Sequence, residues 1–128
     1  MTKNESKHIT SCTILWKSAD DISGVTTKVL QTEIQVRFYN NGSLTGGRIW
    51  PMSDKQKQEL FSVLYKCIDD WVCDDYTDSE PKGNHWQFKI CTQRSCIRTA
   101  HGTIEPPHGA EIKNILAGII GEDNCYFF

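Results

Sequence analysis

Residues 34–71 read IQVRFYNNGSLTGGRIWPMSDKQKQELFSVLYKCIDDW and decide the fold. Apolar residues alternate with polar ones at the start of this stretch, which is the two-residue period of a strand with one buried face: Ile34, Val36 and Phe38. The dipeptide Asn41-Gly42 then favours a tight hairpin turn, because both residues tolerate positive φ angles. The stretch therefore predicts a β-hairpin whose return strand covers roughly 43–50 and ends at Pro51.

A helix is predicted directly after this hairpin. Ser53 can cap its first turn, and Gln56 completes a Ser-x-x-Gln capping box. Apolar residues then recur at helical spacing, at Leu60, Val63, Leu64, Cys67, Ile68 and Trp71. Because polar residues lie largely off this stripe, the helix should bury one face and end near residue 72 or 73.

Extended segments are also predicted before this unit. Residues 9–17 are rich in β-branched and aromatic side chains, which favour strands. A turn is expected at 20–24, where Asp20-Asp21-Ile22-Ser23-Gly24 stands. A longer extended segment is expected to run from Val25 to Tyr39 without interruption.

A second hairpin and a second helix are predicted downstream. Apolar and polar residues alternate between His85 and Cys91, and a return strand should cover 96–101 after a turn at 93–95. A shorter helix over about 110–120 should bury Ile112, Ile115, Leu116 and Ile119. The aromatic residues 126–128 at the end of the sequence are expected to pack against the body.

The two hairpin–helix units resemble each other. Gly47-x-Ile49-x-Pro51 recurs as Gly102-x-Ile104-x-Pro106, and the same offset aligns Leu60 with Ile115. A strand-to-helix junction with Gly and Pro is common, so convergence explains the match as well as an internal repeat of 25–73 and 84–121 does. The sequence thus predicts one α+β domain over residues 1–128. Its sheet should be antiparallel and twisted, with five to seven strands and two helices on one face.

Composition limits the classes of function. The chain has 128 residues, of which 38% are hydrophobic and 23% charged, as in one globular domain. Its net charge of −2 gives no overall basic surplus, so direct nucleic-acid binding is not expected. The polar start lacks the apolar run of a signal peptide, and no stretch approaches a membrane span. We therefore expect a cytoplasmic protein with no membrane partner.

The cysteines and histidines offer two weaker chemical hypotheses. With no signal peptide, we expect thiols rather than disulfides at Cys12, Cys67, Cys73, Cys91, Cys96 and Cys125. The sequence has no Cys-x-x-Cys pair, but His85 and Cys91 could share a strand face and meet Cys96 or His101 across the hairpin. A zinc-stabilised accessory protein and a small enzyme with a Cys/His pair thus stay open as alternatives. We expect no catalytic residue, no metal ligand and no cofactor.

An acidic segment is the most suggestive feature of the chain. Carboxylates gather where the first helix gives way to a loop, with no Lys or Arg among them: Asp69, Asp70, Asp74, Asp75, Asp78 and Glu80. Acids at a helix C-terminus oppose the helix dipole, so Asp69 and Asp70 carry a small energetic penalty there. Packing does not explain that penalty. A negative surface speeds association with a positive one. We predict that these residues, with Tyr76 as an anchor, bind a basic protein partner.

The segment 68–120 resembles small uncharacterised bacterial proteins. The pattern combines Ile68-x-x-Trp71 at a helix end with Gly83-x-x-Trp86-x-Phe88-x-Ile90 and Gly102-x-x-x-Pro106 before an amphipathic helix. It departs from that pattern at Gln93-Arg94, where Asn-Gly or Asp-Gly is usual in the hairpin. The resemblance implies an α+β fold, a bacterial origin and an immunity or accessory role. Together with the acidic segment, it predicts an immunity- or inhibitor-type protein that blocks a toxin or nuclease.

Overall fold

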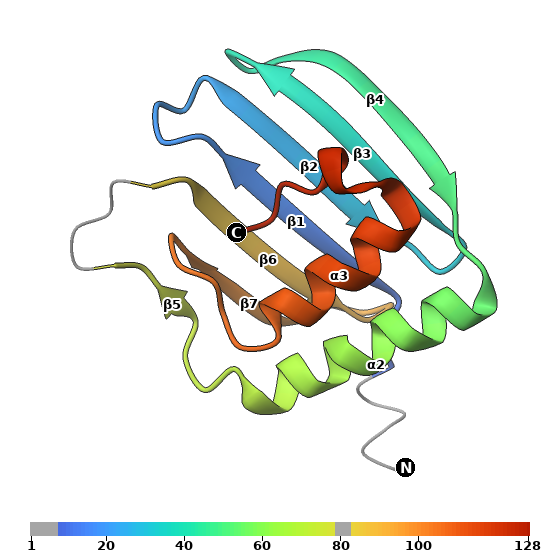
Figure 1. The fold of residues 1–128 in the computed structure, drawn as a ribbon. Helices are drawn as coiled ribbons and strands as arrows, with labels where there is room; N and C mark the ends of the chain where they lie inside the picture. The colour runs from blue at the N-terminus through green and yellow to red at the C-terminus, as the bar shows by residue number, and fades with distance from the viewer. Residues whose placement is uncertain (1–7, 79–82) are drawn as a thin grey trace.

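The computed structural model describes residues 8–78 and 83–128 and shows an α+β fold (Figure 1). The helical elements of this part of the chain are α2 (Asp54–Asp70), α3 (Gly109–Ile120) and the short 3-10 helix η1 (Glu122–Asn124). Its strands are β1 (Ser11–Lys17), β2 (Ser23–Val29), β3 (Glu33–Asn40), β4 (Ser43–Pro51), β5 (Asp75–Tyr76), β6 (His85–Cys91) and β7 (Cys96–Gly102).

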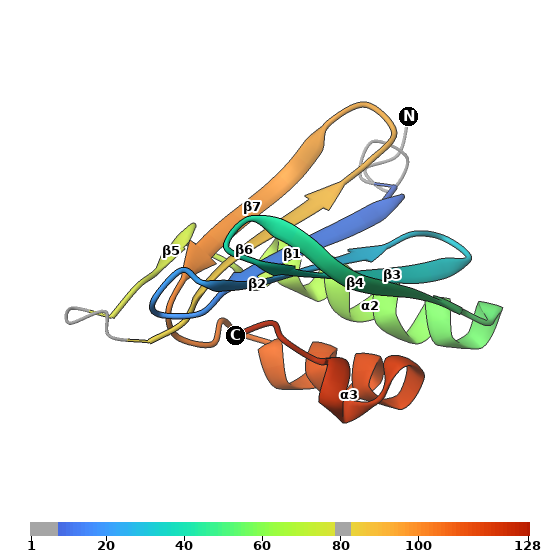
Figure 2. The same ribbon diagram turned by 90° about the horizontal axis from the view of Figure 1, so that it is seen from above.

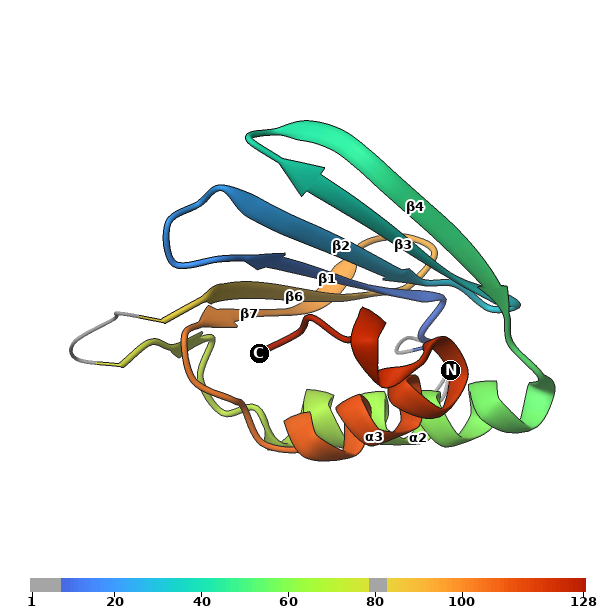
Figure 3. The same ribbon diagram turned by 45° about the horizontal axis from the view of Figure 1, so that its top comes forward.

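The strands form one seven-stranded sheet in the order β4-β3-β2-β1-β6-β7-β5. Neighbouring strands are antiparallel except for β5, which pairs with β7 in parallel. The sheet is therefore mixed, and the prediction of an antiparallel sheet was wrong at this edge. Strand β5 has only two residues, which are too few to show the alternation of apolar and polar residues that predicts a strand. Figures 2 and 3 show α2 and α3 on the same side of the sheet.

Helix α2 begins as its sequence predicts. The Ser53 hydroxyl accepts a hydrogen bond from the Gln56 backbone N–H, and the Gln56 side chain accepts one from the Ser53 N–H, which confirms the capping box. The helix ends at Asp70, slightly before the predicted end. Trp71 leaves the helical conformation there, and its fully buried indole donates a hydrogen bond to the Pro107 carbonyl at 2.7 Å.

The extended segment predicted over 25–39 is two strands. The Leu30 N–H donates to the Glu33 carbonyl at 2.9 Å, which closes a turn between β2 and β3. Neither Gly nor Pro marks this turn, so the sequence carries no ordinary turn signal there. By contrast, Asn41 and Gly42 have φ angles of 51° and 80°, which confirms the predicted hairpin between β3 and β4.

The core lies between the sheet and the two helices. Strands β1, β2, β3 and β6 turn alternate residues to this inner face, where they meet the buried stripes of the helices around Leu64 and Leu116. The final residues also reach the core, as predicted, since Phe127 is buried and Phe128 stacks on Phe88 with ring centroids 6.1 Å apart. No helix of residues 8–78 and 83–128 is long and apolar enough to cross a membrane.

Candidate functional site

We use the name acidic end for the predicted binding residues that the structure describes: Asp69, Asp70, Asp74, Asp75 and Asp78. Glu80 lies outside the described residues. The first two carboxylates follow one another at the end of α2, and the others stand in and around β5 at the edge of the sheet. The fold therefore gathers these residues at one end of the molecule, where Figure 1 shows α2, β5 and β7 side by side.

A glycine on β7 sets the position of β5. A Cβ atom added at Gly102 would lie 2.3 Å from the Tyr76 carbonyl oxygen, so a larger residue would push β5 away. The same carbonyl accepts hydrogen bonds from the Thr103 and Ile104 N–H groups, both at 3.1 Å. The Asp74 carbonyl accepts a third from the His101 N–H at 2.9 Å. Backbone contacts thus hold the acidic end against β7.

Tyr76 packs against other aromatic residues of the chain. Its half-buried ring stacks on Trp86 with centroids 6.1 Å apart and meets the edge of Trp71 at 6.4 Å. Its hydroxyl oxygen is buried, and burial is the main cause that raises the pKa of Tyr76. These ring contacts fix the acidic end to the protein's own aromatic core, and the role of Tyr76 as an interface anchor stays a prediction.

His108 links the acidic end to α3. The His108 Nε2 atom lies 2.5 Å from Asp70 Oδ2, and Nδ1 lies 2.9 Å from Glu111 Oε1. Both ring nitrogens therefore face carboxylate oxygens, an arrangement that a doubly protonated ring satisfies. The bonds to Glu111 and then Asp70 raise the pKa of His108, and the bond to His108 is the main cause that lowers the pKa of Glu111. Asp70 is held in the helical layer.

A second histidine faces Asp75 in another layer. The His101 Nε2 atom lies 3.6 Å from Asp75 Oδ1, and both side chains are more than half exposed. His101 pairs with Gln87, whose neighbours Trp86 and Phe88 point into the core, so His101 faces away from the helices. Hydrogen bonds from Thr77 are the main cause that lowers the pKa of Asp75. Asp70 and Asp75 thus share one end of the molecule but different layers.

Four carboxylates of the acidic end are not neutralised by strong cations of the described chain. Among residues 8–78 and 83–128, Lys66 with Glu111 is the one ion pair that includes a lysine or arginine, at 3.7 Å. The side chains of Asp69 and Asp74 are exposed and form no ion pair within this part of the chain, while Asp70 and Asp75 meet only histidines. Sequence reasoning missed both partner histidines, because His101 and His108 are far from these acids along the chain.

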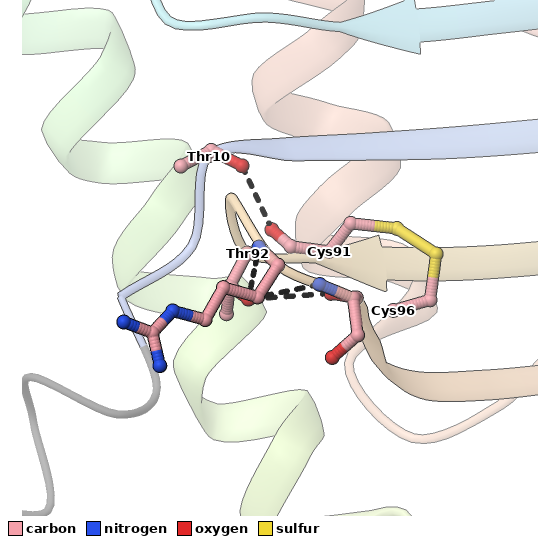
Figure 4. The surroundings of a disulfide bond; sticks show 6 residues. Thr10, Cys91, Thr92 and Cys96 are labelled. Atoms are coloured by element: carbon pink, nitrogen blue, oxygen red, sulfur yellow. Dashed lines mark hydrogen bonds between the residues drawn. A yellow bond between two sulfur atoms is a disulfide. The ribbon is translucent and has the colours of Figure 1, made fainter.

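Cys91 and Cys96 form a disulfide, so the expectation of free thiols was wrong for this pair (Figure 4). The bond joins β6 to β7 beside a turn closed by the Thr92 N–H, which donates to the Ser95 carbonyl at 2.8 Å. Antiparallel pairing brings the two sulfurs together, which spacing along the sequence cannot show. Cys12 and Cys67 are buried thiols, and burial is the main cause that raises the pKa of Cys67 to about 12.

The Cys/His and zinc hypotheses gain nothing from this geometry. The disulfide occupies both sulfurs that would act as nucleophile or ligand, and His85 starts the strand that Cys91 ends. Within the described residues, no three His, Cys, Asp or Glu side chains are grouped so that they could hold a metal ion. Comparisons of the chain with protein-family models, curated proteins and solved structures found no match. Function must therefore be argued from the site alone.

Proposed function

We propose that this protein is a binding module of the immunity or inhibitor type, whose acidic end binds and blocks a basic protein. One observation carries the proposal. Asp69, Asp70, Asp74 and Asp75 stand at one end of the fold, and none forms an ion pair with a lysine or arginine of the described chain. Charge of one sign that no lysine or arginine offsets attracts a partner of the other sign and sets its orientation.

The proposed mechanism is occlusion without a covalent step. The acidic end steers a basic surface, such as the substrate-binding cleft of a nuclease, toward the edge of the sheet. Gly102 and Tyr76 hold β5 in place, so the carboxylates need little ordering on binding and the complex loses little entropy. The proposal includes the cytoplasmic location and the bacterial origin that the sequence predicts. The proposal needs no cofactor and no catalytic residue.

The first experiment identifies the partner. The full chain, immobilised under native conditions at low ionic strength, should retain one basic protein in stoichiometric amount, identified by mass spectrometry. Salt should release it, because exposed charges are screened within roughly 10 Å at about 0.1 M ionic strength. Recovery of an acidic protein alone, or of none, contradicts the proposal.

The second experiment tests the surface. The triple variant Asp69→Asn, Asp74→Asn, Asp75→Asn removes three charges, while the amide oxygen that Asp75→Asn introduces can still accept the Thr77 N–H bond. Association with the recovered partner should slow by about tenfold at low salt, since electrostatic steering acts on the on-rate. The matched control Glu59→Gln, Glu122→Gln, Asp123→Asn removes equal charge from exposed sites elsewhere. Equal rates for the two triple variants would show that the acidic end is not the interface.

A further inference from the structure

The face of the sheet opposite the helices carries a second charged surface. Figures 2 and 3 show α2 and α3 on one side only, and no described helix covers the other. The core-facing residues of β1, β2, β3 and β6 alternate with residues that point to this open side. Four of these outward residues are cations: Lys17, Lys28, Arg37 and Lys89. We use the name open face for these four residues and the strand surface between them.

Strand register brings the four cations onto one surface. Thr13 pairs with Lys28 on one side and with Lys89 on the other, so these lysines flank β1 in a single row. Thr26 pairs with Arg37 and with Leu15, which places the guanidinium in the next row. Directly opposite residues point to the same face of a sheet, and adjacent strands lie about 4.8 Å apart. The charges therefore cluster across four neighbouring strands.

The acids on this side of the sheet stand at the margins of the open face rather than between its cations. None of the four cations forms an ion pair within residues 8–78 and 83–128. Glu33 accepts a hydrogen bond from the Gln35 side chain at 2.8 Å. Asp21 lines the hollow beside Lys17, and Asp75 stands two strands away from Lys89, next to His101. The side chains between the cations are neutral: Thr13, Thr26 and Gln87 can form hydrogen bonds, and Leu15 between Thr26 and Gln87 is apolar. A cationic surface with polar groups between its charges is suited to carboxylates.

Two hollows lie on this face. One, of about 240 Å³, is lined by Leu15, Lys17, Asp21, Thr26 and Tyr39 among others, so it holds a carboxylate of the chain beside its lysine. The other, of about 380 Å³, is lined by Gln35, Val36, Arg37, Gly47, Arg48 and Ile49. The absence of side chains at Gly24 and Gly47 helps to leave these spaces open. The second hollow combines Arg37 with apolar walls and no acid, and a carboxylate on a short apolar stem fits that combination.

We propose that the open face binds a second protein through an acidic surface of that partner. The proposal does not depend on the function of the acidic end, of which Asp75 stands at the β5 edge of the same side of the sheet. With both surfaces in use, the protein would connect a basic partner to an acidic one. The net charge of −2 conceals this division, because it averages the two surfaces.

The observations favour an acidic protein over a nucleic acid. Surfaces for single strands usually stack bases on several aromatic side chains. Tyr39 is the one Phe, Trp or Tyr among the outward residues of the described strands, and it is half-buried. Four phosphate contacts would give weak, salt-sensitive binding, and the acidic end would repel the rest of a long polyanion. A compact acidic protein can meet the open face alone.

The test uses short poly-L-glutamate as the probe for an acidic protein. An oligothymidylate of equal charge is measured in the same way and represents nucleic acid. Binding to the full chain is measured by calorimetry at low ionic strength. The variant Lys28→Gln, Arg37→Gln, Lys89→Gln should weaken poly-L-glutamate binding by about tenfold, since the attraction is electrostatic. The control Lys55→Gln, Lys66→Gln, Lys113→Gln removes equal charge from exposed sites on the helices and should change binding less than about twofold.

Three results would overturn the proposal. The first is equal weakening in the two triple variants, and the second is no measurable binding of poly-L-glutamate by the full chain. The third is tighter binding of the oligothymidylate with the same dependence on Lys28, Arg37 and Lys89, which would assign the face to nucleic acid. Amide shift changes confined to β1, β2, β3 and β6 during titration would support it. The acidic-end variant should bind poly-L-glutamate at least as well as the original chain, so the two proposals fail separately.

Discussion

The acidic end and the open face carry opposite charges and arise in different ways. The acidic end comes from one short stretch of sequence, and a helix terminus and a two-residue strand keep it together. The open face draws one cation from each of four strands, and only their register unites them. A surface built from contiguous residues can be found by reading the chain, whereas a surface built by strand pairing cannot. Four predictions break or sharpen this contrast.

The largest effect should come from the core that both regions share. Leu64 is fully buried beneath the sheet, so Leu64→Ala should lower the free energy of unfolding by about 2–5 kcal/mol. Denaturant unfolding followed by circular dichroism measures the change. Leu44 is 61% exposed, and Leu44→Ala should change stability by less than about 0.5 kcal/mol. If the two variants proved equally stable, the described core would be wrong.

A substitution that forces β5 away from β7 should affect the acidic end and leave the open face unchanged. In Gly102→Ala the new methyl meets the Tyr76 carbonyl, so the cost should lie at the upper end of about 1–3 kcal/mol. Displacing β5 should weaken binding of the basic partner while poly-L-glutamate binding stays unchanged. Gly83→Ala is the control, because an added Cβ there meets nothing within 4 Å. Loss of both binding activities together would mean that the two surfaces are not independent.

Removing the disulfide should act on the β6–β7 end of the sheet. Cys91 and Cys96 are 5 residues apart, and a loop this short contributes roughly 2 kcal/mol in the chain-entropy model. The double variant Cys91→Ser, Cys96→Ser should therefore unfold at lower urea concentration than the oxidised protein. It should match the original chain measured with reductant, since the turn hydrogen bonds at Thr92 survive in both. A difference between the serine variant and the reduced original chain would point to a role for the thiols themselves.

The smallest effect is a pH dependence at the acidic end. The pKa of His108 is raised above its ordinary value of 6.5. Its contribution to the free energy of unfolding is therefore present below pH 6.5 and fades as the pH rises through the raised pKa. The pKa of Glu111 is lowered, so its contribution to stability is lost only when the pH falls through that lowered pKa. His108→Asn, which tolerates the observed φ of 66°, should lower stability most in weakly acidic buffer.

Urea unfolding on either side of pH 6.5 measures this prediction. His85 is exposed and has no carboxylate partner among the described residues, so His85→Gln is the control and should leave the pH profile unchanged. A His108→Asn profile parallel to that of the original chain would show that the bridge to Asp70 and Glu111 contributes no pH dependence.

Local sequence determined most of the elements. Asn41-Gly42 and the Ser53–Gln56 box specify a turn and a helix start through bonds among near neighbours, so their structure can be read from a few residues. Alternation also assigned Arg37 and Lys89 to outward faces before any pairing was known. The acidic segment was visible for the same reason, since its members are close along the chain.

Only the tertiary structure decided which distant residues meet. The parallel pairing of β5 with β7 depends on long-range backbone bonds, and the turn at 30–32 closes without the Gly or Pro that would mark it in the sequence. The partnership of Asp70 with His108, the disulfide, and the clustering of cations on the open face all depend on packing and register. Periodicity states which way a side chain points within its own element, but the free energy of the whole core selects its neighbours.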